Sequence, residues 1–239
     1  MILAAGRGSR LAPLTDTIPK CMVPIAGLPL LEHTVRLLRS HGVTDLVVNL
    51  HHLPEVVVGH FGDGGGVGVR IAYSPERELQ GTAGALREAA ALLPDDAPFF
   101  LWFGDNLSRC RLDLLWAAHR RGGGVATMAL HERADPTRSG IVGMDADDRI
   151  THFLEKPRPD QVFSHWVNAG ILVLEPAVLV AIPPAGPADL GRDIFPALLA
   201  SGATLTGYRL TPEEGLWWID TPQDLRAVEQ ASRSWPAPS

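Results

Sequence analysis

Cysteine is scarce in this sequence, and basic residues do not outnumber acidic ones. Among the 239 residues only Cys21 and Cys110 are cysteines, too few for a disulfide framework, so both thiols are expected to stay reduced. The formal net charge of −6 and the pI near 5.8 argue against a nucleic-acid-binding surface, which is normally basic. A site for a phosphorylated ligand would therefore need a few well-placed cations or metal ions.

Long apolar runs are missing as well. No stretch of roughly eighteen apolar residues occurs, and the N-terminus lacks a cationic region followed by an apolar one. The sequence therefore predicts a cytoplasmic protein that binds neither membrane nor nucleic acid. We expect it to be a monomer or a homodimer.

Two common glycine loops are also absent. The dinucleotide fingerprint needs a third glycine where Leu11 stands, and an acidic residue after the next strand, where Asn49 offers only an amide. A P-loop needs Gly-Lys-Ser/Thr after its spacer, and this stretch has none. Both of these nucleotide-binding patterns are excluded.

What is present is a different glycine turn near the N-terminus. The apolar run from Ile2 to Ala5 leads directly into Gly6-Arg7-Gly8-Ser9-Arg10, as a buried strand does when it ends in a phosphate-binding turn. Glycine tolerates positive φ and carries no Cβ, so backbone N–H groups here can approach an anion closely. Arg10 and Lys20 add fixed positive charge, and the pattern predicts a polyphosphate site. A surface turn with solvated cations is the alternative.

This stretch resembles the signature of the sugar-1-phosphate nucleotidylyltransferases, through Leu3-Ala4-Ala5-Gly6, Gly8-Ser9-Arg10-Leu11 and Pro19-Lys20. The resemblance implies that the loop and Arg10 hold the nucleotide's phosphates, and that Lys20 helps to neutralise the reacting α-phosphate. It also extends to later motifs. The nucleotide-binding residues it implies are Leu3, Ala5, Gly6, Gly8, Ser9, Gln80, Gly81 and Thr82, the last three from the segment GlnGlyThrAlaGly.

Strands and helices alternate along the rest of the chain, which predicts an α/β protein. By the resemblance, the fold is a three-layer, doubly wound mixed sheet, the Rossmann-like fold of nucleotide-diphospho-sugar transferases. We expect one domain over residues 1–239, with a nucleotide half near 1–110 and a sugar-phosphate half near 111–230, and a disordered end at 234–239. Predicted helices cover 30–39, 83–93, 112–121 and 193–199; predicted strands cover 46–50, 67–73, 99–103, 125–132, 141–145, 150–155 and 205–210.

Asp105 follows the continuous apolar strand 99–103, at the end of the strand where ligands collect in open α/β sheets. Its carboxylate could simply cap a helix. Next to a phosphate loop we favour metal ligation, because Mg²⁺ bound to phosphates requires hard oxygen ligands. Mg²⁺ is therefore the expected cofactor.

The later motifs resemble the family's acceptor-binding segments, Glu155-Lys156-Pro157 and Asn168-Ala169-Gly170. By the resemblance, Glu155 bonds sugar hydroxyls and Lys156 contacts the acceptor's phosphate. A solvated Glu–Lys pair at a strand end is the alternative reading. The substrate-binding residues implied are Asn106, Gly140, Glu155, Lys156 and Asn168.

The sequence departs from the family pattern around Asp220. Aligned on Trp218, Asp220 is the second metal ligand; aligned on Thr221-Pro222, Trp218 falls on the ligand position. We prefer Asp220, because no other acid is near. Thr221 is expected to cap the final helix through its hydroxyl.

Three functions compete on these observations. The first is a nucleotidylyltransferase that joins a nucleoside triphosphate and a sugar 1-phosphate by Mg²⁺-dependent in-line displacement, giving an NDP-sugar and pyrophosphate. The second is a cytidylyltransferase for phosphocholine or a phosphonate, since Pro19-Lys20-Cys21 suits that group too. The third is a regulatory protein that senses nucleotides without turnover, suggested by the altered Asp220 region.

Overall fold

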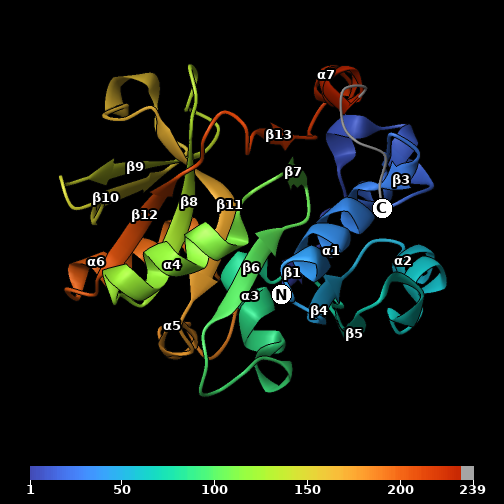
Figure 1. Cartoon of the computed structure of the whole chain (residues 1–239), viewed down its shortest axis with the longest axis horizontal. Helices are drawn as coiled ribbons and strands as arrows, with labels where there is room; N and C mark the ends of the chain where they lie inside the picture. The colour runs from blue at the N-terminus through green and yellow to red at the C-terminus, as the bar shows by residue number, and fades with distance from the viewer. Residues whose placement is uncertain (233–239) are drawn as a thin grey trace. The chain divides into compact units, whose positions relative to one another are not determined.

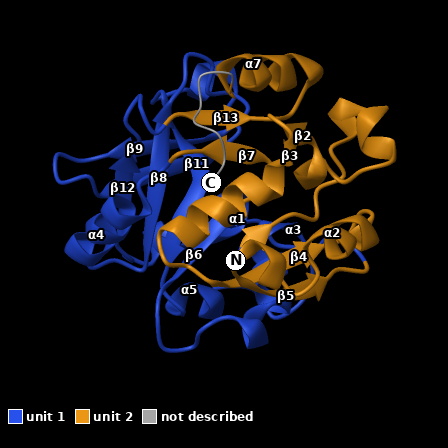
Figure 2. Ribbon diagram, turned by 45° about the vertical axis from the view of Figure 1, so that its right-hand side comes forward, with its two compact units in different colours: residues 1, 78–102, 110–214 blue, residues 2–77, 103–109, 215–239 orange. Residues whose placement is uncertain are grey.

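The computed structural model describes residues 1–232, and the predicted disorder at 234–239 lies outside the described residues. The chain forms two compact units, coloured in Figure 2. Of the described residues, unit 1 holds 1, 78–102 and 110–214, and unit 2 holds 2–77, 103–109 and 215–232. Unit 1 therefore includes residues 78–102 from the expected nucleotide half. The expectation of one domain with two halves stays a prediction.

Unit 2 is built on three parallel strands, β1 (Ile2–Leu3), β4 (Asp45–Leu50) and β5 (Arg70–Pro75). Parallel neighbours need crossover connections, which contain α1 (Leu30–Ser40) and α2 (Pro54–Phe61). Two small antiparallel pairs complete the unit's strands: β2 (Pro24–Ile25) with β3 (Leu28–Pro29), and β7 (Asn106–Ser108) with β13 (Leu216–Trp218).

A hydrophobic cluster joins sequence-distant parts of unit 2. The last helix, α7 (Pro222–Ser232), buries Val228 against residues of the N-terminal segment and of the β7–β13 pair. Burial of such side chains contributes about 1.5–3 kcal/mol each. The cluster consists of Leu11, Val23, Ile25, Leu30, Leu107, Ile219 and Val228.

Unit 1 is built around β11 (Trp166–Leu174), whose residues 169–174 are all buried. This strand pairs antiparallel with β6 (Phe99–Phe103), β8 (Ala126–Glu132) and β9 (Gly140–Met144). Further out, β9 pairs antiparallel with β10 (Ile150–Glu155), and β8 pairs parallel with β12 (Leu205–Arg209). The sheet of unit 1 is therefore mixed, as predicted.

Helices cover both faces of that mixed sheet. The helix α4 (Leu112–Gly122) packs on β8 and β12 and lies in front of them in Figure 1. On the other face α6 (Phe195–Ala200) packs on β10, with the rings of Phe195 and Phe153 5.3 Å apart. The unit also contains α3 (Gly81–Glu88) and α5 (Ala177–Val180).

Several predicted boundaries shift for local reasons. The strand expected from Val67 begins at Arg70, because a 3₁₀ turn (η4, Gly65–Val67) and a positive φ of 75° at Gly68 come first. The helix expected at 83–93 is α3 followed by a 3₁₀ turn, and the one expected at 193–199 begins as a π-helix. That 3₁₀ turn is η5 (Ala90–Leu92), and the π-helix is η7 (Leu190–Ile194). The other 3₁₀ turns of the described residues are η1 (Ser9–Leu11), η2 (Leu14–Asp16), η3 (Lys20–Met22) and η6 (Pro159–Gln161).

The α/β class with a mixed sheet is confirmed. Within residues 1–232, none of the helices combines the length and the apolar character that a membrane crossing requires. Both cysteines are buried thiols, Cys21 in unit 2 and Cys110 in unit 1.

We predict that neither thiol reacts in the native protein. Burial raises the pKa of Cys21 to about 12 and also raises that of Cys110, so roughly one Cys21 side chain in ten thousand is a thiolate at pH 8. Titration with a chromogenic disulfide reagent at pH 8 should find two reactive thiols in guanidinium and fewer than one without it. Rapid labelling of two thiols in the native protein would contradict this.

Candidate active site

The glycine turn of unit 2 is tied to the neighbouring strand by a side chain. The backbone N–H of Ala4 donates to Oδ1 of Asn49 at 2.7 Å, and Nδ2 of Asn49 donates to Oε1 of Glu76 at 2.5 Å. Asn49 is only 2% exposed. Sequence reasoning used Asn49 only to exclude a dinucleotide site and missed this role. The available signal was an amide at the end of an otherwise apolar strand.

The two glycines of the turn serve different needs. Gly8 has φ of 64°, and a Cβ there would lie 2.8 Å from Cβ of Lys20, so the lysine stem packs directly on the glycine backbone. A Cβ at Gly6 would meet no protein atom within 4 Å. Protein packing thus explains the glycine at position 8, and the open space at Gly6 is available to a ligand.

Lys20 is the centre of a charge cluster in unit 2. Its Nζ lies 2.9 Å from Oδ2 of Asp105 and 2.5 Å from Oδ1 of Asp220, and Arg10 lies 2.9 Å from the same Asp220 oxygen. The Lys20 side chain is 8% exposed, whereas that of Arg10 is 53% exposed. The predicted catalytic residues Arg10 and Lys20 are therefore brought together with both predicted metal ligands.

Burial alone would lower the pKa of Lys20, but the charges and hydrogen bonds of Asp105 and Asp220 raise it above its ordinary value. The ammonium group consequently stays protonated throughout the neutral range. It also offsets the repulsion that two adjacent carboxylates would otherwise feel.

Backbone pairing explains how Asp105 and Asp220 meet. The N–H of Gly104 donates to the carbonyl of Leu3 at 2.8 Å, which places Asp105 beside the glycine turn. The N–H of Ile219 donates to the carbonyl of Asp105 at 3.1 Å, continuing the β7–β13 pair. Because Asp220 lies beside Asp105, this geometry favours the alignment on Trp218, in which Asp220 holds the ligand position, over the alignment on Thr221-Pro222. Its role as a metal ligand stays a prediction.

Asp224 supports the Asp220 segment and was missed from the sequence. Its Oδ2 accepts the N–H groups of Asp220 at 3.2 Å and Thr221 at 2.8 Å, while the Thr221 hydroxyl accepts the N–H of Asp224 at 3.2 Å. The predicted cap by Thr221 is thus confirmed. The Thr-x-x-Asp spacing before a helix was the signal that could have identified Asp224.

Asn106, predicted to bind substrate, is 0% exposed on β7. Its backbone pairs with Trp218 of β13. This packing places the side chain inside unit 2, so substrate contact through it would require a different conformation.

The segment around Gln80 closes onto residue 188 within unit 1. Gly81 has φ of 76°, and a Cβ there would overlap the carbonyl of Ala188. That carbonyl accepts the N–H groups of Ala83 at 3.0 Å and Gly84 at 3.1 Å, while the Ala188 N–H donates to the carbonyl of Gln80 at 2.8 Å. Two of the backbone N–H groups in the first turn of α3 are therefore bonded within the protein.

Thr82 was predicted to bind nucleotide, but its hydroxyl is engaged within the protein. It donates to Oδ2 of Asp189 at 3.0 Å and accepts the N–H of Leu190 at 2.8 Å. That Thr82 binds nucleotide stays a prediction, and the contact would be made through its backbone. Asp189 was not singled out from the sequence, because a pairing across 107 positions leaves no local pattern.

Glu155 and Lys156 lie at the end of β10 in unit 1. A Cβ at Gly140 would stand 2.7 Å from Oε2 of Glu155, so these two predicted residues are adjacent. Burial raises the pKa of Glu155, although Lys156 opposes the rise. Lys156 has φ of 50° and a side chain that is 56% exposed, with its Nζ 3.7 Å from the Glu155 carboxylate. Left-handed backbone at a non-glycine residue costs energy and is concentrated at functional sites.

Asn168 sits at an irregularity of β11. Its Oδ1 accepts the N–H of Gly170 at 2.9 Å, and Gly170 has φ of 70° where the register with β8 shifts. Such bulges redirect a side chain, and here the Asn168 side chain shapes its own strand.

Comparison with known proteins identifies the family. Residues 1–232 match the model of the nucleotidyl transferase family, so the chain belongs to that family. It is 37% identical over 232 residues to a UTP–glucose-1-phosphate uridylyltransferase of Synechocystis, covering 92% of this chain and 59% of the relative. It is 36% identical over 231 residues to a mannose-1-phosphate guanylyltransferase of Mycobacterium tuberculosis, covering 94% and 62%.

The chain thus spans about three fifths of the length of these curated relatives. Among solved structures it resembles a Bacillus anthracis protein provisionally described as a glucose-1-phosphate thymidylyltransferase, in complex with sucrose. The TM-score is 0.87 at 25% identity, covering 98% of this chain and 95% of that chain. These matches confirm the predicted family and its Rossmann-like fold.

We predict that Asn49→Leu destabilises the protein by about 1–3 kcal/mol, because the buried N–H of Ala4 loses its acceptor. Urea unfolding measures the loss, and hydrogen exchange should show faster exchange of the Ala4 amide. Glu76→Gln is the matched control, since it changes the other partner of Asn49 and leaves the oxygen of Asn49 in place for Ala4, so the Ala4 amide should exchange as in the wild type. Equal stability of Asn49→Leu and the wild type would show that the tie is unimportant.

Proposed function

We propose that this chain transfers a nucleotidyl group from a nucleoside triphosphate to a sugar 1-phosphate, releasing pyrophosphate. The observation that carries the proposal is the Lys20 cluster beside the glycine turn, a pair of fixed cations with two carboxylates. Family membership supports it. The relatives named for glucose 1-phosphate and mannose 1-phosphate favour a sugar acceptor over phosphocholine or a phosphonate.

The reaction needs little covalent help from the protein. A phosphate monoester is already ionised near neutral pH, so its oxygen can attack the α-phosphorus without a general base. One P–O bond forms to the acceptor, the bond to the bridging oxygen breaks, and pyrophosphate leaves with that electron pair. The protein's task is positioning and charge neutralisation, for which Arg10 and Lys20 are suited.

A metal ion fits the cluster by the chemistry of its donors. Asp105 and Asp220 both contact the Lys20 ammonium, so their carboxylates lie close together, and we infer that their oxygens would hold Mg²⁺ together with substrate phosphates and water. Within residues 1–232 no group of three or more His, Cys, Asp or Glu is arranged to hold a metal by itself. When bound, the ion supplies positive charge to the phosphate oxygens. Lys20 keeps the two carboxylates in place beforehand.

Residues of unit 1 are suited to recognising the acceptor and the nucleobase. We infer that Glu155 accepts hydrogen bonds from sugar hydroxyls, and that the exposed Lys156 contacts the acceptor's phosphate. Backbone groups of Gln80 and Gly81 would lie against the nucleobase. Asn168 and Gly140 would complete the wall of the acceptor site.

A matrix of nucleoside triphosphates against phosphorylated acceptors, with Mg²⁺ and read by pyrophosphate release, tests the function. We expect release only when a triphosphate and a sugar 1-phosphate are both present. Release from a triphosphate with phosphocholine as the only effective acceptor would favour the cytidylyltransferase function. No release with any pair, despite triphosphate binding, would favour a sensor.

We predict that Lys20→Ala lowers kcat by about 100-fold or more, because its charge acts where negative charge develops on the phosphates. Steady-state pyrophosphate release measures kcat, and circular dichroism checks the fold.

Lys156→Ala is the matched control for this loss of a lysine. It should raise the KM for the acceptor much more than the KM for the triphosphate, and leave kcat closer to the wild-type value. A folded Lys20→Ala variant with unchanged kcat would exclude the assigned role of Lys20.

A further inference from the structure

The carboxylate of Glu155 lies between two glycine backbones of unit 1. A Cβ on Gly140 of β9 would stand 2.7 Å from its Oε2, and a Cβ on Gly191 of η7 would stand 2.5 Å from the same oxygen. Real Cβ atoms do not approach this closely. Neither glycine can gain a side chain unless the carboxylate moves.

The two glycines differ in what else they contact. A Cβ on Gly140 would also overlap the ring of Phe153, which is 9% exposed and packs on Phe195 of α6. A Cβ on Gly191 would meet the end of the Glu155 side chain first and would lie 3.3 Å from the Phe153 ring. A side chain at Gly191 would therefore displace mainly a flexible carboxylate, with little disturbance of the core.

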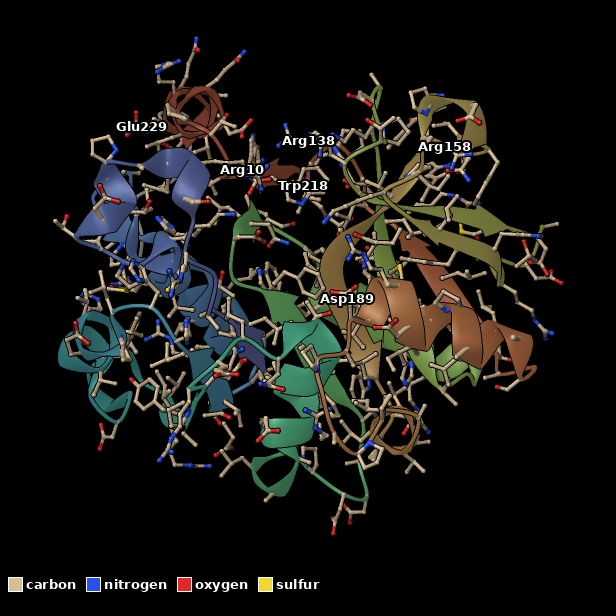
Figure 3. All side chains as sticks on the ribbon, turned by 180° about the vertical axis from the view of Figure 1, so that it is seen from behind. Arg10, Arg138, Arg158, Asp189, Trp218 and Glu229 are labelled. Atoms are coloured by element: carbon tan, nitrogen blue, oxygen red, sulfur yellow. The ribbon has the colours of Figure 1, made fainter. Side chains whose placement is uncertain are left out.

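Asp189 and Thr82 hold Gly191 in this position. Oδ1 of Asp189 accepts the N–H groups of Gly191 at 3.0 Å and Arg192 at 3.2 Å, and its Oδ2 accepts the Thr82 hydroxyl. Thr82 in turn accepts the N–H of Leu190 at 2.8 Å. Asp189, labelled in Figure 3, thus fastens the start of η7 to the start of α3.

We propose that Gly191 is a specificity-determining position for the acceptor, with Thr82 and Asp189 as the positioning residues that hold it. The inference rests on the proposed function, in which Glu155 bonds the hydroxyls of the acceptor sugar. Hydrogen bonds tolerate only small errors in distance and angle. The bare backbone at Gly191 fixes where the Glu155 carboxylate meets those hydroxyls, and so which sugars fit.

The test compares Gly191→Ala, Thr82→Val and the conservative Thr82→Ser with the wild type. Gly59→Ala is the matched control, because a Cβ there meets no atom within 4 Å. KM for the acceptor, KM for the triphosphate and kcat are measured by pyrophosphate release. Thermal unfolding of each variant checks that the fold is retained.

We expect Gly191→Ala to raise the acceptor KM by about tenfold or more, with the triphosphate KM within about twofold of wild type. Thr82→Val should change the acceptor KM in the same direction, and Thr82→Ser should restore it. Gly59→Ala should behave as the wild type. Equal changes in both KM values, or an unchanged acceptor KM in Gly191→Ala, would overturn the proposal.

Removing the carboxylate separates this effect from general disruption. In a Glu155→Ala background, adding Gly191→Ala should change the acceptor KM no further, since the displaced group is gone. A further tenfold rise in that background would show that Gly191 acts by another route and would overturn the proposal.

A binding measurement distinguishes failure of this inference from failure of the proposed function. If the wild type releases no pyrophosphate with any pair, calorimetry with glucose 1-phosphate and mannose 1-phosphate decides. If a sugar phosphate that binds the wild type binds Gly191→Ala more weakly, the inference is supported, although the proposed function is then wrong. Equal binding to both proteins, or no binding to the wild type, overturns the inference.

Discussion

The ammonium group of Lys20, bound between two carboxylates, is the interaction on which the rest of unit 2 depends. An almost fully buried charge without a partner costs several kcal/mol, so this lysine requires Asp105 and Asp220 in place. Those acids lie 85 and 200 residues further along the chain. The turn after β6, the β7–β13 pair and the Thr221–Asp224 cap all serve to deliver them. Gly8 is needed for the same reason, because its bare backbone makes room for the lysine stem.

The two units offer different chemistry. Unit 2 presents concentrated charge, with Arg10 exposed and Lys20 buried, as binding of phosphates requires. Unit 1 presents shaped hydrogen-bonding groups, where Glu155 is confined by glycines and Lys156 is held in a left-handed backbone. Every nucleotidyl transfer needs charge neutralisation, whereas the groups that recognise a sugar differ from one acceptor to another. We therefore expect variation at Gly191 to alter acceptor choice, and changes at Lys20 to lower kcat whatever the acceptor.

Sequence reasoning succeeded where several constraints fell close together in the chain. The glycine turn, Arg10 and Lys20 form one short pattern, and Asp105 ends an unbroken apolar strand, so both could be placed beforehand. It could not give side-chain directions or distant partners. The hydroxyl of Thr82 bonds Asp189, Asn106 faces the interior, and Asn49 holds the turn through a bond between strands. No local pattern encodes those pairings, because folding alone brings the partners together.

The central claim is that Asp105 and Asp220, aligned by Lys20, form one site for the metal and the phosphates. The most direct test is the Mg²⁺ concentration for half-maximal pyrophosphate release by Asp105→Asn and by Asp220→Asn, each of which leaves Lys20 one charged partner. We predict that both variants need more Mg²⁺ than the wild type, since both disable one site. A normal Mg²⁺ requirement and normal rate for Asp220→Asn would contradict it.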